Sequence, residues 1–124
     1  MARILIAEDE EPLRTLIRRA LAEEGHTVVE TADGSEALDR LQSERDGFDL
    51  LLADIKMPVM DGIALALAVA RDFPKLPILL MTGYADQRER VSGLEALICD
   101  VISKPFALAE IKFAVASALA KGKR

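Results

Sequence analysis

Four short apolar segments of this sequence each end at a polar residue with a chemically useful side chain. The segments are residues 4–7, followed by Glu8 and Asp9; residues 50–53, followed by Asp54; residues 78–81, followed by Thr82; and residues 101–103, followed by Lys104. In an open sheet of parallel strands, residues that follow the carboxyl ends of several strands converge on one crevice. The pattern therefore predicts a single pocket assembled from strand ends.

The alternation of strand-like and helix-like segments predicts the fold class. Strands are predicted at residues 3–7, 27–30, 48–53, 78–81 and 98–103. Helices are predicted at residues 12–24, 35–44, 63–72 and 108–120, with a fifth within residues 86–96, where Gly93 weakens the pattern. Because helical crossovers between strands imply right-handed βαβ units, we expect a flavodoxin-like, doubly wound α/β fold with parallel strands in the order 2-1-3-4-5.

Composition limits the class of protein. A chain of 124 residues, 51% of them apolar, suits one globular domain over residues 1–124. The net charge of −5 argues against a nucleic-acid partner, which requires a concentrated basic face. The apolar stretch at residues 63–70 is far shorter than the ~20 residues that cross a bilayer. A single cysteine, Cys99, excludes an internal disulfide. We therefore expect a cytoplasmic protein with no membrane or nucleic-acid partner.

The acids at the strand ends suit phosphoryl transfer. A carboxylate can attack phosphorus to form an aspartyl phosphate, provided that the repulsion between the two anions is offset. Mg²⁺ offsets this repulsion and prefers oxygen ligands, with carboxylates and waters among them. We predict Asp9 and Asp54 as direct ligands, Glu8 as a ligand through water, and the backbone carbonyl of Lys56 as a further oxygen.

Thr82 and Lys104 complete the predicted pocket. Lys104 would neutralise a phosphoryl oxygen, and Thr82 would donate a hydrogen bond to another. Each residue also has an ordinary interpretation, since Thr82 alone suits a turn and Lys104 alone suits a solvated surface. Glu10 and Glu11 are interpreted only as acids at a helix N-terminus, where the helix dipole favours them. The occurrence of all the strand-end residues together favours the pocket.

In order and spacing, these motifs resemble those of the response-regulator receiver domains of bacterial two-component signalling. The resemblance covers nearly the whole chain and is carried by residues 4–10, residues 54–62, Thr82-Gly83 and Lys104-Pro105-Phe106. It implies that Asp54 accepts a phosphoryl group from the phosphohistidine of a histidine kinase or histidine phosphotransfer protein. It also implies that Glu8 and Asp9 serve Mg²⁺, that Thr82 and Lys104 sense the phosphoryl group, and that the bond before Pro105 is cis.

The sequence departs from the receiver pattern at the switch position. Many receivers carry an aromatic switch residue three positions before the lysine, and this chain has Val101 there. Tyr84, two residues beyond Thr82, could take the place of that aromatic. We also predict that Lys56 and Tyr84 flank the path of hydrolytic water and affect the lifetime of the phosphoryl group.

Within receivers, the chain is most similar to stand-alone, CpdR-type regulators, which have no output domain and prime a bacterial AAA+ protease. This likeness implies action in trans, as a monomer or weak dimer, through a surface formed by helix four, strand five and helix five. It implies a cell-cycle role as a protease adaptor that is inactive when phosphorylated. A phosphorelay intermediate, or a receiver that controls a kinase without an adaptor role, stays open as an alternative.

Two rival functions belong to other classes. A phosphatase enzyme with an aspartyl-phosphate intermediate requires a second acid two residues after the nucleophile, and this chain has Lys56 there, so no general acid is evident. A scaffold that lost the chemistry is disfavoured by the complete set of pocket residues. We therefore predict a non-enzymatic, stoichiometric switch.

Overall fold

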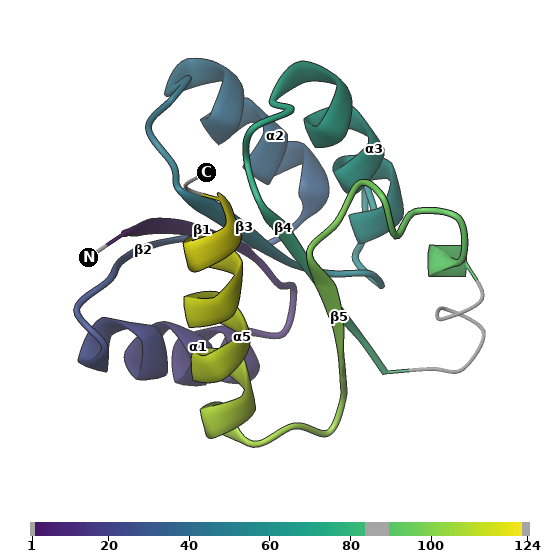
Figure 1. Cartoon of the computed structure of the whole chain (residues 1–124). Helices are drawn as coiled ribbons and strands as arrows, with labels where there is room; N and C mark the ends of the chain where they lie inside the picture. The colour runs from purple at the N-terminus through teal and green to yellow at the C-terminus, as the bar shows by residue number, and fades with distance from the viewer. Residues whose placement is uncertain (1, 84–89, 123–124) are drawn as a thin grey trace.

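The computed structural model describes residues 2–83 and 90–122, which contain a five-stranded sheet. The sheet lies at the centre of the molecule, between the helices (Figure 1). All four strand pairings are parallel, and the order is β2-β1-β3-β4-β5, which confirms the predicted topology. The strands are β1 (Arg3–Ala7), β2 (Thr27–Thr31), β3 (Leu50–Asp54), β4 (Ile78–Thr82) and β5 (Asp100–Ser103). β3 and β4 are buried along their whole length, because helices cover both faces of the sheet.

The helices form two layers, with α1 (Glu11–Glu23) and α5 (Leu108–Gly122) on one face and α2 (Gly34–Ser43) and α3 (Gly62–Asp72) on the other (Figure 1). Alternate residues of each strand point to opposite faces. On β1, Ile4 and Ile6 therefore pack in the core beneath α1 and α5, whereas Leu5 and Ala7 pack in the core beneath α2 and α3. The sheet thus separates two hydrophobic cores.

The prediction of five helices is wrong for the part of the chain that the structure describes, where four are present. The predicted helix at residues 86–96 includes residues 86–89, which lie outside the described ranges. From Arg90 onward, helical geometry extends only to Val91, and isolated turns follow. Gly93 has a φ of 94° in the left-handed region, which ends a right-handed helix.

The described elements differ from the predicted ones by a few residues at their ends, as is usual where strands and helices fray. β3 begins at Leu50 and β5 at Asp100, each two residues later than predicted. None of the helices in the described ranges has both the length and the apolar composition needed to cross a membrane.

Candidate functional site

The strand register brings the predicted polar residues to one edge of the sheet. Ala7 on β1 is level with Ala53 on β3, and Thr82 on β4 is level with Ser103 on β5. The residues at and just beyond these positions therefore lie side by side at the carboxyl edge. A hollow of about 550 Å³ opens there, and its lining residues are Asp9, Glu10, Asp54, Lys56, Gly83, Lys104 and Pro105.

The ammonium of Lys104 is the centre of the site. Its Nζ donates to Asp54 Oδ2 at 2.9 Å and to Glu8 Oε1 at 3.2 Å. Glu10 Oε1 lies 3.8 Å from the same nitrogen. Three carboxylates from two different strand ends therefore share one positive charge, and the site carries an excess of negative charge.

Burial makes this excess energetically costly. Glu8 is 0% exposed and Asp54 is 4% exposed. Burial, followed by the charge of Asp54, raises the pKa of Glu8 to about 7. Burial also raises the pKa of Asp54, although the hydrogen bond and charge of Lys104 oppose the rise. Burial alone would lower the pKa of Lys104, but its bonds to Asp54 and Glu8 outweigh that effect and raise it.

The donor set fits a hard divalent cation. Carboxylate oxygens of Glu8, Glu10 and Asp54 all lie within 4.8 Å of one another. Oxygen ligands of this kind are the ones that Mg²⁺ prefers. A cation between them would offset the repulsion from Asp54 that adds to the effect of burial on the pKa of Glu8. Asp9 is exposed and lines the same hollow, but its carboxylate does not belong to this group among the described residues.

Glu10 is the site residue that sequence reasoning missed. It directly follows the predicted metal residues Glu8 and Asp9, but Glu10 and Glu11 were explained by the helix dipole alone. In the structure Glu10 is the N-cap of α1, yet its side chain makes no capping hydrogen bond. The carboxylate lies beside Glu8 and Asp54 instead. Proximity to the other acids in sequence was the available indication.

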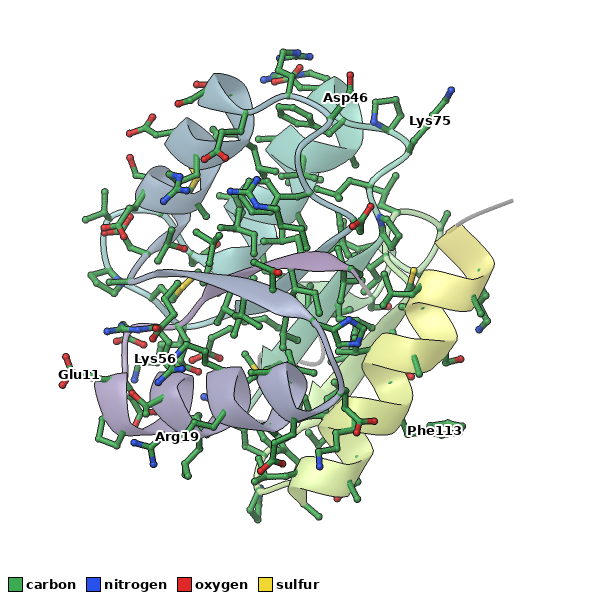
Figure 2. All side chains as sticks on the ribbon, turned by 90° about the vertical axis from the view of Figure 1, so that its left-hand side faces the viewer. Glu11, Arg19, Asp46, Lys56, Lys75 and Phe113 are labelled. Carbon is green, nitrogen blue, oxygen red and sulfur yellow. The ribbon has the colours of Figure 1, made fainter. Side chains whose placement is uncertain are left out.

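The other predicted residues occupy different surroundings. Thr82 is buried at the end of β4, and its carbonyl accepts the backbone N–H of Lys104 at 2.7 Å. Lys56 is exposed, and Figure 2 shows it near the start of α1. Val101 is half-buried and packs against the core beneath α2 and α3. The bond between Lys104 and Pro105 is cis, as the resemblance implies. Tyr84 lies outside the described residues.

The sequence matches the family model described as "Response regulator receiver domain" over residues 4–116. It is 39% identical over 109 residues to "Response regulator MprA" of Mycobacterium avium, an alignment that covers 88% of this chain and 47% of that protein. The alignment with MprA of Mycobacterium tuberculosis has the same identity and covers 46% of the relative. The chain therefore spans less than half the length of these curated relatives.

Solved receiver structures have the same fold. The signal receiver domain of a signal transduction histidine kinase from Syntrophus aciditrophicus is 32% identical, with a TM-score of 0.89 and coverage of 100% of this chain and 94% of that one. TrrA from Thermotoga maritima, solved in complex with Mg²⁺-BeF, is 30% identical, with a TM-score of 0.84 and coverage of 95% and 99%. These relatives do not confirm the narrower likeness to CpdR-type regulators, which stays a prediction. The protein belongs to the response-regulator receiver family of two-component signalling.

Proposed function

We propose that this protein is a phosphoaspartate switch in which Asp54 accepts a phosphoryl group from the phosphohistidine of a histidine kinase or histidine phosphotransfer protein. The observation that carries the proposal is the buried pair of Asp54 and Glu8 held around the Lys104 ammonium. The structural similarity to TrrA, which was solved with Mg²⁺-BeF, supports a magnesium-dependent site.

In the proposed reaction, a carboxylate oxygen of Asp54 attacks phosphorus in line with the leaving group. The new P–O bond forms as the P–N bond of the phosphohistidine breaks, and the imidazole nitrogen leaves with the bonding electrons. Mg²⁺ would be held by Glu8, Asp9, Asp54 and the Lys56 carbonyl, and it would supply charge that offsets the repulsion between the two anions. The Lys104 ammonium lies 2.9 Å from the Asp54 carboxylate, so it is close enough to bind an oxygen of a phosphoryl group attached there. We propose that Lys104 moves from Asp54 to that oxygen.

Thr82 is proposed to donate its hydroxyl to another phosphoryl oxygen. Its backbone is tied to that of Lys104 by the 2.7 Å hydrogen bond from Lys104 N–H to the Thr82 carbonyl. A shift of Thr82 toward the phosphoryl group would therefore displace Lys104, and a shift of Lys104 would displace Thr82. Val101, three residues before Lys104, would transmit this change to the surface in place of an aromatic switch residue.

The surface of β5 and α5 is the proposed contact for a downstream partner. A groove between these elements is floored by Leu79, Ile102 and Ala118. Phe113, at its rim, is 77% exposed and points away from the body of the protein (Figure 2). An exposed aromatic beside a groove with an apolar floor is typical of protein interaction surfaces. We propose an AAA+ protease as the partner, bound in the unphosphorylated state.

Labelling by acetyl phosphate tests the phosphoaspartate proposal. We expect the parent to incorporate one phosphoryl group per chain in MgCl₂ and none in EDTA. Asp54→Ala should abolish incorporation, whereas Asp39→Ala, which removes an exposed carboxylate from α2, should leave it unchanged. Incorporation that survives in Asp54→Ala would refute the assignment.

A pull-down experiment tests the proposed partner. Immobilised Asp54→Ala should retain an AAA+ protease, and immobilised Phe113→Ala should not.

The stoichiometry also separates the switch from an aspartyl-phosphate phosphatase. A phosphatase requires an acid near the leaving group, and the position two residues after Asp54 is the exposed Lys56. We therefore expect the label to be released slowly as inorganic phosphate, without rapid turnover of phosphoesters. Sustained turnover of p-nitrophenyl phosphate would favour the enzyme instead.

A further inference from the structure

The direction of the Glu10 side chain is not explained by the role of this residue as a helix N-cap. As the N-cap of α1 it has extended backbone angles, with φ −82° and ψ 104°, and its carbonyl accepts the N–H of Arg14 at 2.9 Å. N-cap side chains ordinarily accept a hydrogen bond from the first turn of the helix. Glu10 makes no such bond. Its carboxylate is therefore not engaged in capping.

The backbone of Glu10 is instead tied to the site. Its N–H donates to Glu8 Oε2 at 3.1 Å, so the buried carboxylate of Glu8 orients the chain where α1 begins. From there the Glu10 side chain lies with Oε1 3.8 Å from Lys104 Nζ. Its oxygen is also within 4.8 Å of the carboxylate oxygens of Glu8 and Asp54.

We propose that Glu10 is a metal-affinity residue, whose carboxylate adds a third negative charge to the cation site and strengthens the binding of Mg²⁺. The inference rests on the magnesium site of the proposed function and extends it to a residue outside the predicted ligand set. Because the Glu10 side chain is 67% exposed, solvent screens part of its charge. We therefore expect a moderate contribution to affinity.

Glu11 provides a matched control. It is the first residue of α1, its side chain is 82% exposed, and its nearest cation is Arg14 at 3.7 Å. Glu10→Gln and Glu11→Gln each remove one negative charge from the same helix N-terminus. Both therefore alter the net charge and the interaction with the helix dipole similarly. Only Glu10→Gln removes a carboxylate from the cluster of Glu8 and Asp54.

Isothermal titration of the intact protein with MgCl₂, without a phosphodonor, tests the proposal. We expect Glu10→Gln to raise the dissociation constant about fivefold and Glu11→Gln to change it by less than about twofold. Equal dissociation constants for the two variants would overturn the assignment, as would a parent that does not bind Mg²⁺.

Acetyl phosphate labelling separates this inference from the proposed function. If the parent binds Mg²⁺ and is labelled at Asp54 while the Glu10 and Glu11 variants bind Mg²⁺ equally, only the role of Glu10 fails. If the parent is not labelled and does not bind Mg²⁺, both the role of Glu10 and the proposed function fail. A selective loss of affinity in Glu10→Gln supports both.

Discussion

The carboxyl and amino edges of the sheet both carry a hollow lined by charged residues, but only the carboxyl edge has the properties of a functional site. The carboxyl edge carries the hollow beside Glu8 and Asp54. The amino edge carries a hollow of about 430 Å³ whose lining includes Arg45, Phe48 and Phe73. Figure 2 shows Lys56 on the side of the carboxyl edge, and Asp46 and Lys75 on the opposite side of the molecule.

At the amino edge Arg3 is held by several structural partners. Arg3 donates to Glu44 at 2.6 Å and to the Gly47 carbonyl at 3.0 Å, and its guanidinium lies 4.3 Å from the centre of the Phe48 ring. Such contacts tie β1 to the loop that precedes β3, and they pair the charge of Arg3 with that of Glu44. Hydrogen bonds from Arg3 and Arg40 accordingly lower the pKa of Glu44.

At the carboxyl edge, by contrast, three carboxylates share the Lys104 ammonium and two of them are buried. Burial raises the pKa of Glu8 and Asp54 there. The size of a hollow therefore says little about function in this molecule. An uncompensated, buried charge that a ligand could relieve is the feature that distinguishes the functional edge, because proteins ordinarily pair or neutralise such charges.

The largest effect should come from the pH dependence of stability. The pKa of Glu8 is 4.5 in its ordinary state and about 7 in the folded protein. The folded state binds more protons than the unfolded state between these values, so the free energy of unfolding should fall as the pH rises from 4.5 to about 7. The loss should be on the order of 3 kcal/mol. Urea denaturation in EDTA measures it.

Two comparisons sharpen this test. Glu8→Gln should remove most of the fall in stability, and MgCl₂ should reduce the fall in the parent by binding the folded state. Glu44 at the amino edge should behave oppositely, because its lowered pKa gives stability that is lost as the pH falls. If the parent loses no more stability than Glu8→Gln as the pH rises from 4.5 to about 7, the contrast between the two edges is contradicted.

Glycines at the two edges should respond differently to a methyl group. A Cβ on Gly62 would clash with the backbone carbonyl oxygen of Asp54 and lie 2.8 Å from Ile55 Cα, both in the segment that positions the phosphoacceptor. Gly62→Ala should cost about 2 kcal/mol and slow acetyl phosphate labelling, because the backbone of Asp54 must shift.

Gly47→Ala is the matched change at the amino edge. Its Cβ would lie 2.8 Å from the Glu44 backbone carbonyl oxygen, which would have to shift, and 3.0 Å from Arg3 Nη1, which is the movable end of a side chain. Neither atom belongs to the segment that positions Asp54. We expect a cost of about 1 kcal/mol with normal labelling. Thermal denaturation and labelling of both variants check the pair. Normal labelling of Gly62→Ala would show that the position of Asp54 tolerates the shift.

The smallest effect concerns two residues in the left-handed backbone region, one near each edge. Val59 has φ 68° in the loop after β3, and Asp46 has φ 65° in the loop before it. A β-branched residue is strained in this region, whereas aspartate is tolerated. Val59→Gly should therefore stabilise the protein by about 1 kcal/mol, and Asp46→Gly by about 0.3 kcal/mol or less. Urea midpoints measure both, and equal gains would argue against strain at Val59.

Much of the fold followed from local sequence. Apolar runs of strand length alternate with helical periodicity, and the right-handed crossover rule leaves few topologies for such a chain. The order β2-β1-β3-β4-β5 was predictable for that reason. The helix predicted within residues 86–96 was wrong beyond Val91, where Gly93 adopts a φ of 94° that a glycine permits but its neighbours in sequence do not dictate.

Local apolar runs mark the ends of strands, so the amino-acid sequence alone predicts which acids follow β1 and β3 and that Lys104 follows β5. Which carboxylates surround the Lys104 ammonium depends on the packing of the folded chain. Only the register of Ala7 with Ala53 and the direction of the first turn of α1 bring Glu10, rather than Asp9, into the cluster with Glu8 and Asp54. Side-chain direction at a helix start depends on packing and charge across the sheet edge, and neither is encoded in residue spacing alone.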